Sequence, residues 1–337
     1  MIEEMVITKT PFRMSFFGGG TDIPEFFNEY GGAVLSTTFD KYCYVTARHL
    51  PRFFDYANEL VYSKIERVVD PADFEHPAVR NAMEMLDMRE LRVTYEADLP
   101  ARSGLGTSSS FAVGMLNAFH CIKGAHTSKE RLAKEAIWLE RELCGEVGGW
   151  QDQIAAAYGG LNRIDFSSEG FSVRPIVISN ERRRELEGNL MMFFTGFTRF
   201  SSDMQKKNRV ACKSSCLKEM LSLVDEAEAA LTDKRTPLRR FGELLDATWR
   251  LKKAMGDSVS THSIDDLYAR GISAGAVGGK LLGAGGGGFL LFYVEPDAKK
   301  SVTEALSNLL YIPFLLEDKG AQVVYFAPED YELKEER

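Results

Sequence analysis

The stretch Asp98-Leu-Pro-Ala-Arg-Ser-Gly-Leu-Gly-Thr-Ser-Ser-Ser110 places glycines and hydroxyl side chains between two regular segments. Before it, residues 92–97 alternate polar and apolar side chains, which predicts a half-buried strand. After it, Phe111, Met115 and Phe119 follow helical spacing. The sequence therefore predicts a strand, a glycine turn and a helix that begins directly behind the turn.

A turn of this kind can bind phosphate. Its glycines let backbone N–H groups approach phosphate oxygens, and the positive end of the following helix dipole favours negative charge. The hydroxyls could reach a metal ion, or they could only cap the helix, and the turn alone leaves both interpretations open. It is not a P-loop, since it lacks the Gly-Lys-Ser/Thr ending. The candidate phosphate-binding residues are Pro100, Ser103, Gly104, Leu105, Gly106, Thr107, Ser108 and Ser109.

Two further glycine clusters are candidates for ligand binding. Residues 280–288 end in the apolar run 289–292, so a loop nearly free of side chains stands beside a buried strand. Such a loop suits close approach by a ligand, although a tight packing turn is the alternative. Near the N-terminus, residues 11–22 place Arg13 and Asp22 around a third cluster and could bind a polyol.

The rest of the chain mixes strand and helix patterns. We expect an α+β fold in two domains, residues 1–185 and 186–337, divided in the turn-rich stretch 165–188. The other predicted strands are 41–47, 190–194, 289–294 and 323–326, and the other predicted helices are 132–143, 217–231, 241–255 and 298–310.

Composition narrows the function. The 337 residues, 45% of them hydrophobic, are enough for two cores, and a net charge of -8 argues against nucleic-acid or anionic-membrane partners. No apolar run reaches the roughly 18 residues of a membrane span, which predicts a cytoplasmic protein. The cysteines are scattered, which is typical of a reducing compartment and forms no disulfide framework: Cys43, Cys121, Cys144, Cys212 and Cys216.

The three glycine motifs, in this order, resemble the GHMP kinase superfamily over nearly the whole chain. The resemblance implies a two-domain fold, in which the N-terminal domain is like ribosomal protein S5 domain 2 and the C-terminal domain is ferredoxin-like. It also implies ATP as the phosphate donor, with its phosphates bound by the 98–110 turn and by Gly285, Gly286 and Gly287. Residues 54–69 become a candidate wall for the adenine.

The segment Gly149-Trp-Gln-Asp-Gln153 resembles the one that delivers the catalytic aspartate in galactokinases and mevalonate kinases. By this resemblance Asp152 is the catalytic carboxylate, with Arg13 beside it, and Ser108 and Glu140 are ligands of Mg²⁺. Glu142 is the alternative acidic ligand, because the spacing from Glu140 to Asp152 needs a small insertion relative to the mevalonate kinase pattern.

The substrate motif is similar to the galactokinase signature, whose final aspartate binds sugar hydroxyls. This implies that Gly19, Gly20, Thr21, Asp22 and Asp152 bind the substrate. Galactokinases have Glu-His where this chain has two glycines, which leaves space for a larger sugar. With residues 195–202 and 278–288, the motif looks most like the D-glycero-D-manno-heptose 7-phosphate kinases, which phosphorylate the anomeric hydroxyl on the way to nucleotide-activated heptose and surface polysaccharide.

Other functions stay open at this point. A fucose or galactose kinase differs only in the sugar pocket, and a mevalonate-pathway decarboxylase fits the sugar signature less well. A silent sugar and ATP sensor should have lost Asp152, Glu140 or Ser108, which are all present. The expected partners are a sugar or sugar phosphate, ATP and a second copy in a homodimer. The basic residues that could bind a substrate phosphate are Lys9, Lys41, Arg102, Arg199 and Lys206.

Overall fold

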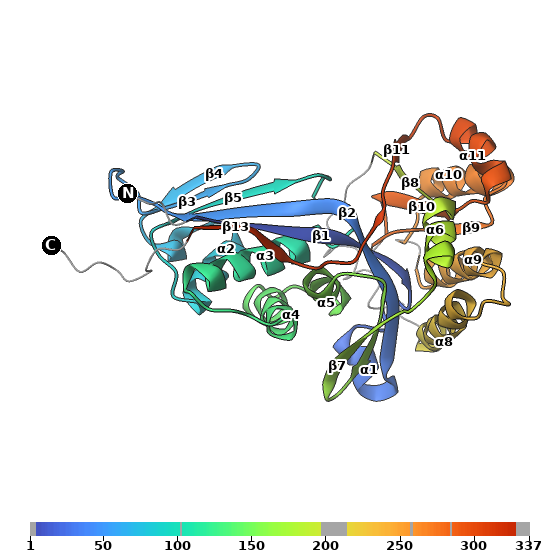
Figure 1. Ribbon diagram of the computed structural model, residues 1–337, viewed down its shortest axis with the longest axis horizontal. Coiled ribbons are helices and arrows are strands. Elements are labelled where there is room, and N and C mark those ends of the chain that lie inside the picture. Colours follow the sequence, from blue (N-terminus) through green and yellow to red (C-terminus); the bar gives the residue numbers. More distant parts are fainter. Residues whose placement is uncertain (1–4, 102, 197–213, 257–258, 284, 328–337) are drawn as a thin grey trace.

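A computed structural model of the chain describes residues 5–101, 103–196, 214–256, 259–283 and 285–327. It contains two β-sheets, each covered by helices, which form two bodies lying end to end (Figure 1). The predicted mixture of helices and strands is therefore confirmed.

The first sheet is built around two long antiparallel strands, β1 (Met5–Phe17) and β2 (Gly32–His49). The sheet has nine strands, and its main order is β13-β1-β2-β5-β3-β4, with β6 and β12 also paired to β2 and β7 paired to β6. The predicted strands at 41–47 and 92–97 lie in β2 and β5. The remaining bounds are β3 (Asn58–Val61), β4 (Ile65–Val68), β5 (Leu91–Ala97), β6 (Asn162–Ser167), β7 (Gly170–Pro175), β12 (Leu316–Glu317) and β13 (Gln322–Ala327).

Helix α3 (Thr107–Ile122) begins at the predicted residue and is almost entirely buried. It packs against β1 and β2, where the Thr8 hydroxyl donates to the Gly114 carbonyl over 2.9 Å. A Cβ at Gly114 would lie 2.8 Å from Thr10 Oγ1, so glycine permits this close approach. The sheet thus holds the N-terminus of α3 rigidly. Helices α2 (Pro77–Met85), α4 (Lys129–Trp138) and α5 (Gln151–Tyr158) lie on the same side of the sheet (Figure 1), and α1 (Pro24–Tyr30) follows β1.

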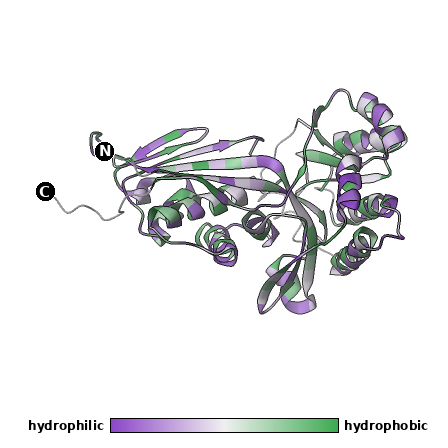
Figure 2. Ribbon diagram, in the orientation of Figure 1, coloured by the Kyte–Doolittle hydropathy of each residue, from purple (hydrophilic) through white to green (hydrophobic). Residues whose placement is uncertain are grey.

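The second body contains a four-stranded sheet in the order β11-β8-β10-β9. Its strands are β8 (Leu190–Phe194), β9 (Gly278–Leu281), β10 (Phe289–Tyr293) and β11 (Leu310–Ile312). Its helices are α6 (Asn180–Asn189), α8 (Ser214–Thr232), α9 (Arg239–Ala254), α10 (His262–Ser273) and α11 (Lys299–Ala305). Figure 2 shows hydrophobic and hydrophilic residues on α8 and α9, as their amphipathic sequence pattern predicts.

Three sequence predictions differ from the structure. The stretch 165–188 was expected to be turns but contains β7 and most of α6, a charged helix that buries only Leu186 and Asn189 and so has no apolar stripe to detect. Helix α10 was not expected. The helix predicted for 298–310 ends at Ala305, and strand β11 follows at Leu310.

The two sheets are not made by consecutive halves of the chain. The predicted boundary between residues 185 and 186 falls inside α6, and β12 and β13 return to the first sheet after the second is complete. Buried Lys280 of β9 also links the bodies, because its ammonium donates to the Ser15 and Phe16 carbonyls of β1, each over 2.8 Å. In the described part of the chain, no helix is long and apolar enough to cross a membrane.

Candidate active site

The predicted phosphate-binding turn and the second glycine loop lie in direct backbone contact. A Cβ at Gly104 would be 2.6 Å from the Leu282 carbonyl oxygen, and a Cβ at Gly283 would overlap the Cα of Gly104. Both glycines have left-handed backbone angles, φ +83° and φ +79°. No side chain fits between these loops, so the structure brings the two predicted motifs together.

A bidentate ion pair joins the N-terminal glycine cluster to the segment Gly149–Gln153, and one further hydrogen bond joins the cluster to the phosphate-binding turn. Arg13 donates to both carboxylate oxygens of Asp152, over 2.7 Å from Nε and 2.6 Å from Nη2, and its Nη1 donates to the Gly104 carbonyl over 2.7 Å. The Arg13 side chain is 6% exposed and that of Asp152 is 27% exposed. The guanidinium therefore orients the carboxylate through two charge-assisted hydrogen bonds, while Asp152 stays open to a ligand.

Gly106 leaves room beside this pair. Its φ is +71°, and a Cβ there would lie 3.2 Å from Arg13 Cγ and 3.4 Å from Asp152 Oδ2. The catalytic candidate thus stands against the turn that precedes α3. The structure brings these residues together from positions 139 apart in the chain.

Asp22 connects the N-terminal glycine cluster to the segment before α5. It is buried and accepts hydrogen bonds from the backbone N–H of Gly20 over 2.8 Å and of Gln151 over 3.2 Å. Burial raises the pKa of Asp22, and the nearby charge of Asp152 adds to the rise. The Asp22 carboxylate occupies the position where a Cβ at residue 149 would lie, so Gly149 cannot carry a side chain here.

The other residues of that cluster differ in their access to the site. Gly19 lies near the Gln151 side chain, since a Cβ there would be 3.6 Å from Nε2. Thr21 is fully buried, and its hydroxyl contacts the Gly18 and Ala33 carbonyl oxygens, each at 2.8 Å. The Thr21 hydroxyl therefore bonds to the backbone of the cluster and not to a ligand. Its role toward a substrate would be to hold the backbone of the cluster in a fixed conformation.

Glu140 is buried close to the same point. It lies in a π-helical turn, Leu139–Leu143, that follows α4, and its carboxylate accepts the Ser109 hydroxyl over 2.6 Å and the Gln153 amide. Burial raises its pKa to about 8, and the charges of Glu146 and Asp152 contribute. A π-helical turn has an extra residue, which accommodates the added spacing to Asp152. Glu142, the alternative ligand, is exposed.

These residues fit a magnesium ion in their chemistry. Carboxylate and hydroxyl oxygens are the ligands Mg²⁺ prefers, and it typically takes one or two carboxylates together with substrate phosphates. A buried carboxylate with a raised pKa would regain its charge beside a cation. The hydroxyl bonded to Glu140 is that of Ser109, whereas Ser108 is exposed. Among the described residues no group of three or more His, Cys, Asp or Glu could hold a metal by itself.

Glu140→Gln should change how stability depends on pH. The folded pKa of about 8 lies above the ordinary 4.5, so the folded chain holds a proton that the unfolded chain loses first. Glu140 contributes its full share to the free energy of unfolding below pH 4.5. This share falls as the pH rises from 4.5 through the folded pKa of about 8. In urea titrations without metal, the parent should lose more stability than Glu140→Gln between pH 6 and pH 8.5. Parallel curves would contradict a buried, titrating Glu140.

The region expected to contact the adenine is rich in aromatic rings. Phe54 stacks on Tyr56, with ring centroids 5.1 Å apart, and Phe54 is 52% exposed. Tyr62 contacts His76, which contacts Phe111 of α3 at 5.5 Å. This aromatic series leads from the β3–β4 hairpin toward the helix that follows the turn, so residues 54–69 stay the predicted adenine wall.

Two of the five basic residues predicted to bind a substrate phosphate, Lys9 and Lys41, do not reach this site. Lys9 lies over the Tyr42 ring, 3.6 Å from its centroid, on the opposite side of β1 from Thr8 and Thr10, which contact α3. Lys41 pairs with Asp40 at 3.0 Å. Arg102, Arg199 and Lys206 lie outside the described residues.

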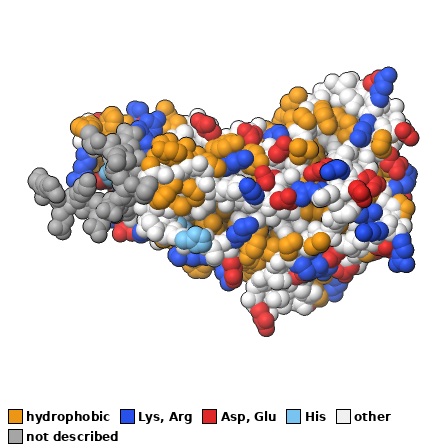
Figure 3. Space-filling model, viewed as in Figure 1, with side chains coloured by type: hydrophobic (Ala, Val, Ile, Leu, Met, Phe, Trp, Pro, Cys, Tyr) orange, Lys and Arg blue, Asp and Glu red, His pale blue; other side chains and the backbone are white. Residues whose placement is uncertain are grey.

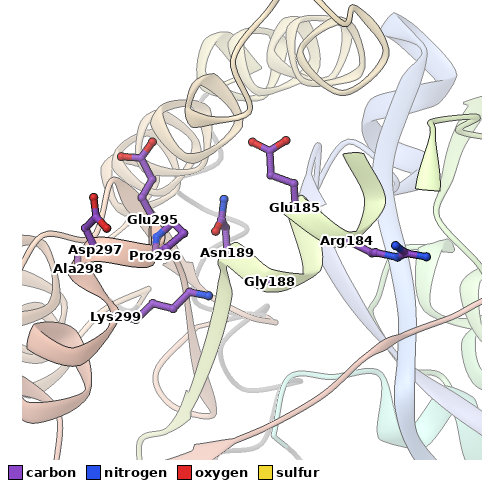
Figure 4. A pocket seen from close by; sticks show the side chains of 9 residues that line it. All are labelled: Arg184, Glu185, Gly188, Asn189, Glu295, Pro296, Asp297, Ala298 and Lys299. Carbon is purple, nitrogen blue, oxygen red and sulfur yellow. The ribbon is translucent and has the colours of Figure 1, made fainter. Parts of the chain in front are cut away.

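The pocket in Figure 4 is also remote from the glycine motifs. It encloses about 570 Å³ between α6 and the segment that follows β10, and its lining includes Glu185, Asn189, Glu295 and Lys299. None of its lining residues belongs to a predicted motif. The candidate site is therefore the place where the three glycine motifs meet, and not this pocket.

Sequence reasoning missed two lysines that reach this meeting point. Lys280 begins the second glycine loop, but nothing in that position indicates its contact with β1. Lys252 of α9 donates to the Gly283 carbonyl and is half-buried. In the sequence it is one of two adjacent lysines on an amphipathic helix, so only the fold distinguishes it.

Comparisons with known proteins show which family the chain resembles. Residues 74–160 match the model of the GHMP kinases N terminal domain and residues 227–312 that of the GHMP kinases C terminal domain. The D-glycero-alpha-D-manno-heptose 7-phosphate kinase of Campylobacter jejuni is 32% identical over 89% of this chain and 92% of its own. The bifunctional fucokinase/GDP-fucose pyrophosphorylase of Arabidopsis thaliana is 28% identical over 86% of this chain and 30% of its own length.

Superposition on solved structures points to the same family. The crystal structure of a D-glycero-D-manno-heptose 1-phosphate kinase from Bacteriodes thetaiotaomicron superposes with a TM-score of 0.77 at 25% identity, covering 96% of this chain and all of that one. The chain belongs to the GHMP kinase superfamily and has its two-domain fold. Within that superfamily it is a sugar kinase, a phosphotransferase that uses ATP to phosphorylate a sugar hydroxyl.

Proposed function

We propose that the protein transfers the γ-phosphoryl group of ATP to the anomeric hydroxyl of D-glycero-D-manno-heptose 7-phosphate, giving heptose 1,7-bisphosphate. The observation that carries this proposal is the side-chain-free Gly19–Gly20 corner next to the Arg13–Asp152 pair, in a chain 32% identical to a heptose 7-phosphate kinase. Without the Glu-His side chains of galactokinases at these two positions, a larger sugar can approach the backbone of the corner closely.

The geometry suits an in-line transfer. Asp152 accepts the proton of the anomeric hydroxyl while the sugar oxygen bonds to the γ-phosphorus and the bond to the β-phosphate oxygen breaks, releasing ADP. Arg13 holds the carboxylate in position through two charge-assisted hydrogen bonds. The backbone of the 103–109 turn and of Gly285, Gly286 and Gly287 would bind the triphosphate.

Magnesium belongs to the same proposal. When bound, it would neutralise phosphate charge, and Glu140 with a neighbouring hydroxyl would hold it. Ser109 is placed for this by its hydrogen bond to Glu140, whereas Ser108, the ligand implied by the resemblance, would have to reach the ion from an exposed position.

Some expectations stay predictions. A cytoplasmic location and a homodimer stay predictions from the sequence, and a role in surface polysaccharide synthesis follows from the proposed substrate. Figure 3 shows acidic and basic side chains interspersed on the visible face, and the absence of a nucleic-acid or membrane partner stays a prediction. A fucose-type kinase is the second candidate, because of the fucokinase relative.

The phosphorylated heptose should be a far better substrate than free heptose. A pocket that binds phosphate by charge-assisted hydrogen bonds loses about 2–4 kcal/mol when the group is missing. This corresponds to roughly 30- to 1,000-fold in kcat/KM. A coupled ADP-release assay with heptose 7-phosphate, heptose, mannose, galactose and fucose would measure it. Equal or faster turnover of an unphosphorylated sugar would rule out the heptose phosphate and leave the sugar kinase.

A further inference from the structure

Helix α9 contributes a lysine to the point where the glycine motifs meet. Lys252 lies in the last turn of α9, and its ammonium donates to the Gly283 carbonyl. The Gly283 backbone touches Gly104, whose own carbonyl accepts Arg13 Nη1 at 2.7 Å. Lys252 and Arg13 thus approach the paired glycine backbones from two different bodies of the protein.

The neighbouring charged groups already have partners. Asp152 accepts two hydrogen bonds from Arg13, and Lys280 donates to two carbonyls of β1. Asp22 accepts two backbone N–H groups. Lys252 differs from Lys280 in having a single acceptor: within the described ranges its ammonium donates only to the Gly283 carbonyl and forms no ion pair, whereas the adjacent Lys253 pairs with Asp265 at 3.0 Å.

Such an ammonium favours an anionic ligand. Burial lowers the pKa of Lys252 to about 8, and the positive charge of Arg13 adds to the effect, while Asp22 opposes it. A half-buried cation with one neutral acceptor lacks the compensation that a buried charge needs. A phosphate oxygen would supply it through a charge-assisted hydrogen bond.

We infer that Lys252 is a catalytic residue of this kinase, whose ammonium binds the phosphoryl group in transit from ATP to the sugar. The position of Lys252 favours the transferred phosphoryl group over the phosphate of the sugar. Lys252 lies where the phosphate turn, the second glycine loop and the Arg13–Asp152 pair converge. The 7-phosphate of the proposed substrate is at the other end of the sugar from the anomeric carbon. The inference rests on the kinase activity but not on which sugar is used.

Three substitutions separate charge from loop support. Lys252→Met removes the ammonium and its hydrogen bond, Lys252→Gln keeps an N–H donor without charge, and Lys252→Arg keeps both. Losing one preorganised charge contact in a transition state costs on the order of 10²- to 10³-fold in kcat. Methionine and glutamine should both show this loss, and arginine should recover to within about tenfold of the parent.

Binding and stability measurements show whether the loss belongs to the chemical step. The Kd for ATP without sugar should change less than about threefold, and the melting temperatures should show that the variants are folded. Lys253→Met is the matched control and should keep parental kcat. Activity of Lys252→Gln near the parental level would mean that the residue only supports the loop, and unchanged kcat in Lys252→Met would overturn the inference.

The sugar panel separates this inference from the substrate proposal. The kcat of each variant is compared with that of the parent on whichever sugar the parent phosphorylates best. If the parent does not phosphorylate heptose 7-phosphate, the substrate proposal is wrong, but Lys252 can still be tested on another sugar. If the loss in Lys252→Met appeared only in KM and vanished with unphosphorylated heptose, Lys252 would bind the 7-phosphate, and the inferred catalytic role would be wrong.

Discussion

Asp152→Asn lowers kcat by about 10²-fold or more and leaves ATP binding nearly unchanged. The amide cannot accept the proton of the attacking hydroxyl, and losing a positioned general base costs about this much. The substitution also leaves Arg13, which is 5% exposed, facing a neutral group. Some stability should therefore be lost, because a buried charge has lost its ionised partner.

Steady-state kinetics, calorimetry with ATP and thermal melting would separate these effects. Asp318→Asn is a suitable control, because Asp318 is also paired with an arginine, Arg183 at 2.6 Å, but its side chain is 65% exposed and it lies outside the site. The control should retain parental kcat. Turnover by Asp152→Asn within a few-fold of the parent would mean that another group accepts the proton.

Gly283→Val should reduce ATP affinity on the order of 100-fold. Its φ is +79°, which disfavours a branched side chain, and the new Cβ would overlap the Gly104 backbone. The two glycine loops would have to separate. Losing about two charge-assisted hydrogen bonds to phosphate costs roughly 3 kcal/mol, which corresponds to this change in affinity.

Gly188→Val is the matched control for this prediction. No atom lies within 4 Å of a Cβ built at Gly188, and the residue is in α6, away from the motifs. Calorimetry with ATP should detect near-parental affinity in the control and strong weakening in Gly283→Val, with melting curves to confirm that both are folded. Unchanged affinity in Gly283→Val would mean that contact between the loops is not needed for nucleotide binding.

Local patterns were enough to place some elements of the first body, but not its long strand β1. The strand at 92–97, the glycine turn and the helix beginning at Thr107 follow from side-chain alternation and helical spacing, which are properties of neighbouring residues; the N-cap of the helix is Gly106, which carries no hydroxyl. Helix α6 escaped prediction because it has almost no apolar face. The sequence predicts a strand at 323–326, but its return to the first sheet beside β1 could not be predicted from these residues alone.

The sequence by itself determined which chemical groups the protein has: three glycine motifs, an aspartate in Gly149–Gln153 and an acidic partner near Glu140. Their order was enough to indicate the superfamily. Tertiary structure alone decided that Ser109 bonds to Glu140, that Gly104 touches Gly283 and that Lys252 reaches this contact. The physical reason is that these contacts join residues about 30 to 180 positions apart, and packing of the two bodies, rather than any local preference, fixes such distances.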